Sequence, residues 1–99
     1  MGAGEDLQRL GLTVGRVLAV EDHPGARAPS FRLTVDLGSG GRRDATLPAP
    51  EYGRDDLLQR QVVCLLEDED LLVLGVHSHA KGLVLLVPDR EVEDGSVVA

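Results

Sequence analysis

The stretch Phe31-Arg32-Leu33-Thr34-Val35-Asp36-Leu37 is the clearest β-strand signal in the sequence. Apolar and polar residues alternate through it, as in a strand with one buried face and one solvent-exposed face. Gly38-Ser39-Gly40-Gly41 follows and can form a tight turn, because glycine adopts positive φ without steric cost. Residues 42–47 are then predicted to return as the partner strand. This pattern predicts an antiparallel hairpin in the first half of the chain.

Further short strands are predicted on both sides of this hairpin. Residues 12–20 are rich in β-forming residues and end at a turn that contains Pro24. After the hairpin, the apolar runs 61–66 and 71–76 predict two buried strands. Another apolar strand is predicted over residues 82–87, and a short final strand can form over residues 92–98.

Two helical segments are predicted. Residues 55–60 begin with two acids and end with a base, which suits the helix dipole. Residues 5–10 can form a helical turn that caps one end of the molecule. Five to seven short strands with one short helix between the third and fourth predict a small barrel, because closure removes exposed strand edges.

Length and composition limit the function classes. With 99 residues and 10.5 kDa, the sequence fits one domain over residues 1–99. No apolar run approaches the roughly 20 residues that span a bilayer, so we expect no membrane association. The single Cys64 cannot form an internal disulfide, which favours the reducing cytoplasm.

The charge argues against indiscriminate binding of polyanions. Seventeen acids and ten bases give a net charge of −7, whereas such binding requires Lys and Arg to neutralise phosphate. Residues 1–60 hold eight bases and nine acids, and residues 61–99 hold two bases and eight acids. Any surface that faces an anion should therefore draw mainly on the first sixty residues. Only Phe31 and Tyr52 are aromatic, which is few for a platform that stacks single-stranded bases.

The order of several segments resembles the tRNA-binding domain family. The opening matches are Leu-Thr-Val-Gly-Arg-Val at 12–17, Glu-Asp-His-Pro-Gly-Ala-Arg at 21–27 and Leu-Thr-Val-Asp-Leu-Gly at 33–38. The run Ala26-Arg27-Ala28-Pro29-Ser30-Phe31-Arg32 is similar to the CsaA branch of that family. Tyr52, Leu57 and Gln61-Val62-Val63 resemble its helix and fourth strand, and Gly75-Val76-His77-Ser78 resembles its Gly-hydrophobic-x-Ser signature.

The resemblance implies an all-β fold, a small five-stranded OB-fold Greek-key barrel. One short helix would lie between strands 3 and 4, with extra N- and C-terminal segments. It also implies a homodimer without catalytic activity, and either a cleft for tRNA or other RNA or a surface for peptides. We expect no cofactor and no bound metal. The apolar residues suited to a dimer interface lie near the two ends: Leu7, Leu10, Val97 and Val98.

The sequence departs from the family at a loop that commonly borders the OB-fold ligand groove. Where the family commonly carries an Asn-Phe-Pro-Pro-Arg-like segment, this chain has Glu67-Asp68-Glu69-Asp70. Each close contact between a carboxylate and a phosphate costs about 1 kcal/mol in water. We therefore expect RNA affinity to be weakened, redirected or lost. The alternative is a chaperone-like module whose acids Glu67, Asp68, Glu69 and Asp70 bind unfolded or basic peptides.

The candidate nucleic-acid-binding residues are cationic or polar. They are Arg42, Arg43, His77, Ser78, His79 and Lys81. Arg16, Arg27 and Arg32 could share a face with Arg42 and Arg43, or could be surface residues that pair with Asp36 and Asp44.

The segment from His77 to Lys81 is open to other interpretations. Its two histidines could hold a divalent metal in an enzyme, but no third ligand is evident. The segment could equally be a pH-sensitive anion site, or a polar turn between buried strands.

Overall fold

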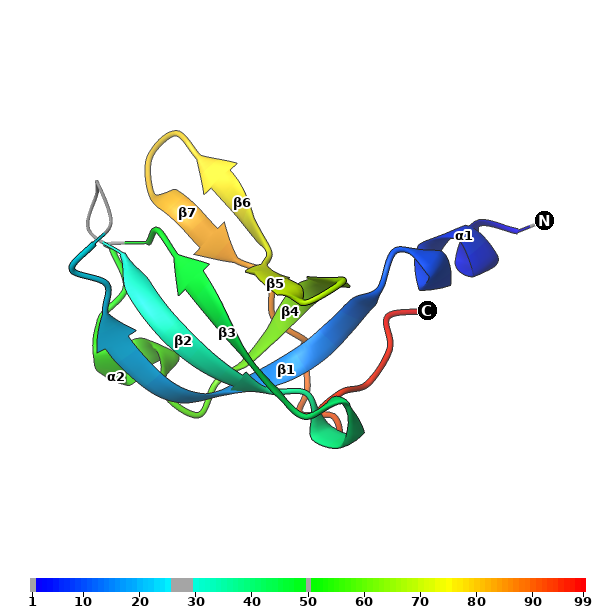
Figure 1. Cartoon of the computed structure of the whole chain (residues 1–99). Coiled ribbons are helices and arrows are strands. Elements are labelled where there is room, and N and C mark those ends of the chain that lie inside the picture. Colours follow the sequence, from blue (N-terminus) through cyan, green and yellow to red (C-terminus); the bar gives the residue numbers. More distant parts are fainter. Residues whose placement is uncertain (1, 26–29, 50) are drawn as a thin grey trace.

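Five antiparallel strands form a strongly coiled sheet with the order β3-β2-β1-β4-β5 (Figure 1). The computed structural model describes residues 2–25, 30–49 and 51–99. The strands are β1 (Leu12–Asp22), β2 (Phe31–Asp36), β3 (Arg42–Leu47), β4 (Gln61–Glu67) and β5 (Asp70–Val73). A second, two-stranded sheet contains β6 (Gly75–Ser78) and β7 (Gly82–Leu85). The predicted all-β OB-fold is confirmed.

The long strand β1 organises the sheet because different parts of it pair with different partners. Its first half pairs with β4, from Leu12 opposite Leu65 to Arg16 opposite Gln61. Its second half pairs with β2, and a bulge between Val17 and Ala19 shifts the register. Where the strands cross, a Cβ at Gly15 would collide with the Val35 side chain. A glycine is therefore required for the close approach that lets the sheet coil.

The central hairpin forms as its alternation predicts. β2 pairs with β3 from Phe31 opposite Leu47 to Asp36 opposite Arg42. Leu33 and Val35 are fully buried, whereas Arg32, whose side chain points to the opposite face of the strand, is exposed. The turn is a 3-10 helix, η1 (Gly38–Gly40), with a φ of 66° at Gly38. The predicted hairpin and its glycine turn are confirmed.

The core fills the inside of the barrel, and a short helix closes one end. The helix is α2 (Arg54–Leu57), and it lies between β3 and β4 as expected. Its one buried residue, Leu57, is fully buried. Around it lie the other fully buried large side chains, which are Leu33, Leu47, Val17, Val35, Val62 and Cys64.

Two predicted elements have different bounds in the structure. The helix expected over 55–60 begins at Arg54 and ends at Leu57, because Leu58 is extended and Gln59 has a φ of 66°. The single buried strand expected over 71–76 is two strands in two sheets, interrupted at Leu74. There the Leu74 N–H donates to Val63 O, while the Leu74 carbonyl accepts from Leu86 N–H. That interruption lets β6 and β7 leave the barrel as a separate hairpin, with Val76 more than half exposed.

Two expectations about the chain ends are wrong. Residues 92–98 form no strand but only an isolated bridge between Thr13 and Val97. The N-terminal helix α1 (Ala3–Arg9) buries no residue and projects away from the barrel (Figure 1). It cannot cap the barrel because its sequence carries too few apolar residues for a buried stripe. Ala26-Arg27-Ala28-Pro29, which contributed to the family resemblance, lies outside the described residues.

Within the described ranges, no helix has the length and apolar character needed to cross a membrane.

Replacing Leu57 should show that α2 is a core element. We expect Leu57→Ala to lower the free energy of unfolding by about 2–5 kcal/mol, the usual range for a fully buried leucine. Leu58→Ala is the matched control, because that neighbouring side chain is 43% exposed, and it should cost less than about 1 kcal/mol. Urea denaturation measures both. Equal losses for the two variants would contradict this role of α2.

Candidate nucleic-acid or peptide interface

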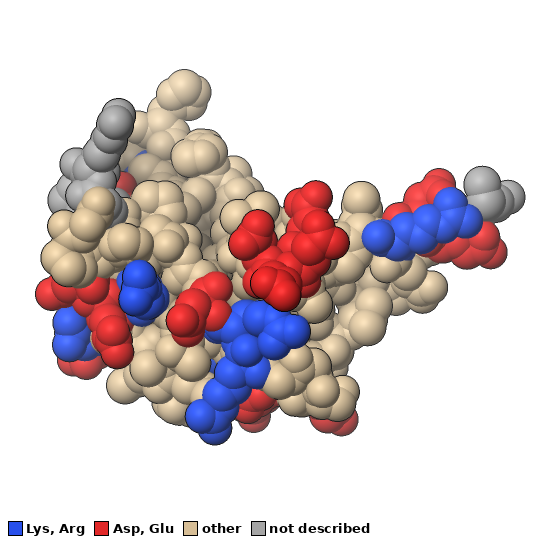
Figure 2. All heavy atoms as spheres, viewed as in Figure 1, with Lys and Arg blue, Asp and Glu red and all other residues tan. Residues whose placement is uncertain are grey.

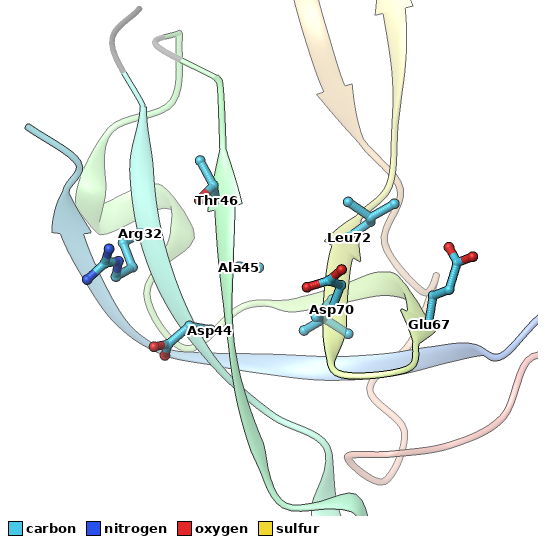
Figure 3. Close-up of a pocket in the computed structure, with 8 residues that line it drawn as sticks. Arg32, Asp44, Ala45, Thr46, Glu67, Asp70 and Leu72 are labelled. Atoms are coloured by element: carbon cyan, nitrogen blue, oxygen red, sulfur yellow. The ribbon is translucent and has the colours of Figure 1, made fainter. Parts of the chain in front are cut away.

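A groove of about 530 Å³ lies between the β2–β3 hairpin and β5 (Figure 3). Its lining residues are Arg32, Asp44, Ala45, Thr46, Glu67, Asp70, Leu71 and Leu72. The strand pairing explains how the polar residues reach it. Arg32 lies opposite Thr46, and Thr34 lies opposite Asp44, on the solvent-exposed side of the hairpin. This is the face, together with the β4–β5 turn, that OB-folds use for ligands.

The groove is acidic. It contains one arginine and three carboxylates, a net charge of −2. Thr34 Oγ1 donates to Asp44 Oδ1 at 3.4 Å, which leaves the charge of that carboxylate in place. Figure 2 shows acidic side chains gathered over the β4–β5 turn, beside a basic group over the β3 side of the same face. The groove therefore favours a cationic ligand over a phosphate.

The acidic turn itself is a solvent-exposed hairpin tip. Glu67 pairs with Asp70 across it, and Asp68 has a φ of 53°, a conformation that aspartate tolerates better than most residues. All four acids from Glu67 to Asp70 are exposed. The four candidate peptide-binding residues are thus brought together at one edge of the groove.

The structure divides the candidate nucleic-acid-binding residues into two groups. Arg42 and Arg43 begin β3, and as strand neighbours they point to opposite faces. Arg42 is exposed, while Arg43 is half-buried and its Nη1 donates to the Arg42 carbonyl at 3.0 Å. The other group, His77, Ser78, His79 and Lys81, lies at the β6–β7 tip, where the Lys81 N–H donates to Ser78 Oγ at 3.3 Å.

These two groups lie near opposite ends of β3. The hairpin tip contacts the segment that follows β3, because a Cβ at Gly82 would collide with the Glu51 carboxylate. Six strand residues span about 16 Å from the first Cα to the last. The six candidate residues therefore do not form one compact patch, and the acidic groove runs along the strand between the two groups.

The β6–β7 hairpin carries no acidic side chain. Residues 71–88 contain no acid, although the chain has seventeen. Lys81 and both histidines are exposed at its tip. Among the described residues, no three His, Cys, Asp or Glu side chains are grouped to hold a metal ion, so the two histidines lack a third ligand. The tip can thus contact an anion but offers no metal centre.

Cys64 is unsuited to nucleophilic chemistry. Its side chain is fully buried, and burial raises the pKa of the thiol to about 11, against a weaker opposing hydrogen bond from the Gly15 backbone. The thiol is therefore protonated at neutral pH and acts as a small core residue.

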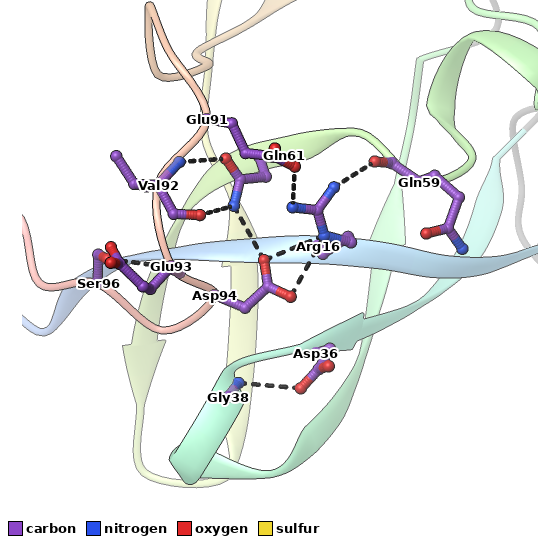
Figure 4. Close-up of polar contacts among 10 residues, drawn as sticks. All are labelled: Arg16, Asp36, Gly38, Gln59, Gln61, Glu91, Val92, Glu93, Asp94 and Ser96. Carbon is purple, nitrogen blue, oxygen red and sulfur yellow. Dashed lines mark hydrogen bonds and ion pairs between the residues drawn. The ribbon is translucent and has the colours of Figure 1, made fainter.

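Sequence reasoning missed the role of Arg16, which is the centre of a polar network (Figure 4). Its Nε donates to both carboxylate oxygens of Asp94 at 3.1 and 3.2 Å, and its Nη2 donates to Glu91 at 2.5 Å. Its Nη1 donates to the Gln59 carbonyl at 2.9 Å. Hydrogen bonds from Glu91 and then Asp94 raise the pKa of the guanidinium above its usual value. Arg16 thus belongs to a structural network that no local motif signals, because its acidic partners lie more than seventy residues away.

This network fixes the C-terminal segment against β1. The Gln61 amide donates to the Val92 carbonyl at 2.5 Å and to Asp94 Oδ1 at 2.9 Å. After Asp94, the Gly95 N–H donates to the Val14 carbonyl at 2.6 Å, and the Val98 N–H donates to the Leu12 carbonyl at 3.0 Å. Residues 95–98 therefore cover the edge of β1 that β2 leaves free.

Arg16→Gln should loosen this segment. We expect the amides of Gly95 and Val98 to exchange with solvent at least about tenfold faster, since the ion pairs that hold their segment are lost. The control is Arg54→Gln, which removes an exposed 3.5 Å pair with Asp22 far from the C-terminus. Hydrogen exchange read by NMR measures both variants. Unchanged protection in Arg16→Gln would show that backbone pairing alone holds the segment.

No protein-family model matches the sequence. The chain is 34% identical over 100 residues to a methionine–tRNA ligase of Thermococcus onnurineus. The aligned region covers 93% of this chain and 14% of that enzyme. A methionine–tRNA ligase of Pyrococcus horikoshii is 31% identical over 102 residues, with 95% and 14% covered. The chain thus spans about one seventh of the length of these curated relatives.

Solved structures match the whole chain. The chaperone CsaA of Bacillus anthracis superposes with a TM-score of 0.87 and 29% identity, covering 100% of this chain and 99% of that one. A CsaA chaperone protein of Picrophilus torridus has a TM-score of 0.88 at 24% identity, with both chains fully covered, and supports the fold alone. Together with the residues quoted above, the matches to the methionine–tRNA ligases and to the Bacillus anthracis CsaA confirm the resemblance of this chain to the CsaA-type tRNA-binding domain family of OB-folds.

Proposed function

We propose that this chain is a non-catalytic tRNA-binding module of the CsaA-like branch, whose affinity is reduced by its acidic β4–β5 turn. The observation that carries this proposal is the match to methionine–tRNA ligases over nearly the whole chain. The matched part is a small fraction of an enzyme that acts on tRNA, and the same fold forms complete chains among CsaA proteins. A binding role therefore fits better than a catalytic one. We further propose a cytoplasmic location, which suits the single free cysteine.

The cationic groups that could contact RNA are available. Among the described residues, Arg42, Arg43 and Lys81 form no ion pair with a carboxylate. A phosphate near β3 would, however, lie close to a groove with a net charge of −2. Each close pair of like charges costs about 1 kcal/mol in water, so the acids lower affinity without preventing binding.

Neutralising the turn should therefore tighten binding to tRNA. We expect the combined variant Glu67→Gln, Asp68→Asn, Glu69→Gln and Asp70→Asn to bind labelled tRNA at least about fivefold more tightly than the natural chain. The matched control changes the same number of exposed acids away from the groove: Glu5→Gln, Asp6→Asn, Asp55→Asn and Glu93→Gln. Fluorescence anisotropy at 100 mM salt would measure all three proteins. Equal gains in the two variants would assign the effect to net charge rather than to the turn.

A second candidate function is supported by the same groove. The carboxylates Asp44, Glu67 and Asp70 line the same groove as Leu72, which is 51% exposed, so a peptide that carries both basic and apolar residues would fit there. The two functions predict opposite results for the turn variant. A labelled lysine- and leucine-containing peptide should bind more weakly once the four acids are neutralised. Unchanged peptide binding would exclude the groove as its site.

We also propose that two copies of the chain associate through their exposed apolar ends. Leu10 is 58% exposed and Val97 is 63% exposed, whereas Leu7 and Val98 are half-buried. We expect sedimentation at twice the mass of 10.5 kDa, and loss of association in the combined variant Leu10→Asp and Val97→Asp. Leu58→Asp is the control for adding charge at an exposed leucine. A natural chain that sediments as a monomer at about 100 μM would contradict the proposal.

A further inference from the structure

A row of polar residues crosses the outer wall of the barrel, beginning on β3 two residues from the groove residue Asp44 and leading away from the groove across the sheet. The strand register places Arg42 opposite Asp36, Asp36 opposite Arg16, and Arg16 opposite Gln61. The row thus runs across β3, β2, β1 and β4. Adjacent strands lie about 4.8 Å apart, so its two ends are separated by about 14 Å. The row therefore extends from one candidate RNA-binding residue, Arg42, to the first residue of β4.

A depression of about 250 Å³ lies at the β4 end of this row. Its lining residues are Arg16, Gln59, Arg60, Gln61, Val87, Pro88, Asp89, Arg90 and Glu91. The backbone at Gln59 has a φ of 66°, and its N–H donates to the Val17 carbonyl at 2.7 Å. This turn leads directly from α2 into β4 and presents Arg60 at the rim of the depression.

The depression contains more basic than acidic residues, unlike the groove. Three arginines and two acids line it, and Asp94, which binds Arg16 beside it, makes the local charge zero, against −2 in the groove. The Glu91 carboxylate is bound by Arg16, which is itself engaged by Asp94. Among the described residues, Arg60 forms no ion pair.

The remaining acid binds its partner weakly. Asp89 lies 3.6 Å from the Nε of Arg90, and both side chains are at least 90% exposed. An ion pair this exposed contributes between zero and about 1 kcal/mol to stability, so an incoming anion can displace the Asp89 carboxylate from Arg90. Arg60 and Arg90 are therefore both available to a ligand.

We propose that Arg60 and Arg90, with Arg42 at the far end of the row, contact the phosphate backbone of RNA on this outer wall. The inference rests on the proposed tRNA binding and locates the phosphate contacts outside the acidic groove. Guanidinium groups suit this role because they bind two phosphate oxygens at once. Arg16 acts as a positioning residue: its carboxylate partners hold the C-terminal segment, and with it Arg90, beside Arg60.

The salt dependence of tRNA binding tests this assignment. Each lost phosphate contact lowers the slope of log affinity against log salt by about 0.7–0.9. We expect the double variant Arg60→Gln and Arg90→Gln to bind labelled tRNA with a slope about 1.5 shallower, and with affinity at 50 mM salt at least about tenfold weaker. The matched control is Arg9→Gln with Arg54→Gln, two exposed arginines that pair with Asp6 and Asp22 instead.

The outcomes separate this inference from the proposed function. Adding Arg42→Gln should lower the slope once more. If the natural chain binds tRNA and the Arg60 and Arg90 variant matches the control, the outer-wall site is wrong and tRNA binding stands. If the natural chain binds no tRNA at 50 mM salt, both proposals fail. Urea unfolding midpoints within error of the natural chain would exclude misfolding as the cause of a loss.

Discussion

The close crossing of β1 and β2 at Gly15 is the constraint on which the rest of the structure depends. No side chain fits there, because a Cβ would collide with Val35. The close approach lets one eleven-residue strand pair with β4 at its start and with β2 at its end. It also leaves one edge of residues 12–14 free, and the C-terminal segment occupies that edge. The barrel, its groove and the Arg16 network all follow from how β1 is shared.

Acidic and basic side chains are unevenly distributed over the surface of the barrel. The groove where OB-folds bind ligands has three carboxylates and one arginine, whereas the depression beside the C-terminal segment has three arginines and two acids. Under the functions proposed above, the first surface would attract a cationic partner, and the phosphate contacts would lie at the second. Under these proposals, a single small domain keeps the fold of its relatives while its surface for phosphate is separate from its surface for a basic partner.

Sequence patterns predicted the secondary-structure elements that depend mainly on residues close together in the sequence. Alternation in residues 31–37 and the following glycines gave the central hairpin, since a strand with one buried face must alternate. Periodicity could not divide residues 71–76 at Leu74, because that break depends on backbone bonds to Val63 and Leu86. The acidic turn was recognised as a departure from the family, but its position beside Asp44 requires the three-dimensional register. For Arg16 the sequence left open a place on a face shared with Arg42 and Arg43 or an ion pair at the surface, because its partners, Glu91 and Asp94, are distant in sequence.

The measurement that tests the central claim most directly is the binding of labelled bulk tRNA to the natural chain at about 50 and 200 mM salt, the range over which phosphate contacts become evident. The proposed function predicts binding at the lower salt that falls steeply at the higher one, as expected if a few arginines contact phosphate while nearby acids limit affinity. An absence of binding at both salt concentrations would contradict it, and would leave the acidic groove and a basic peptide as the alternative that this structure supports.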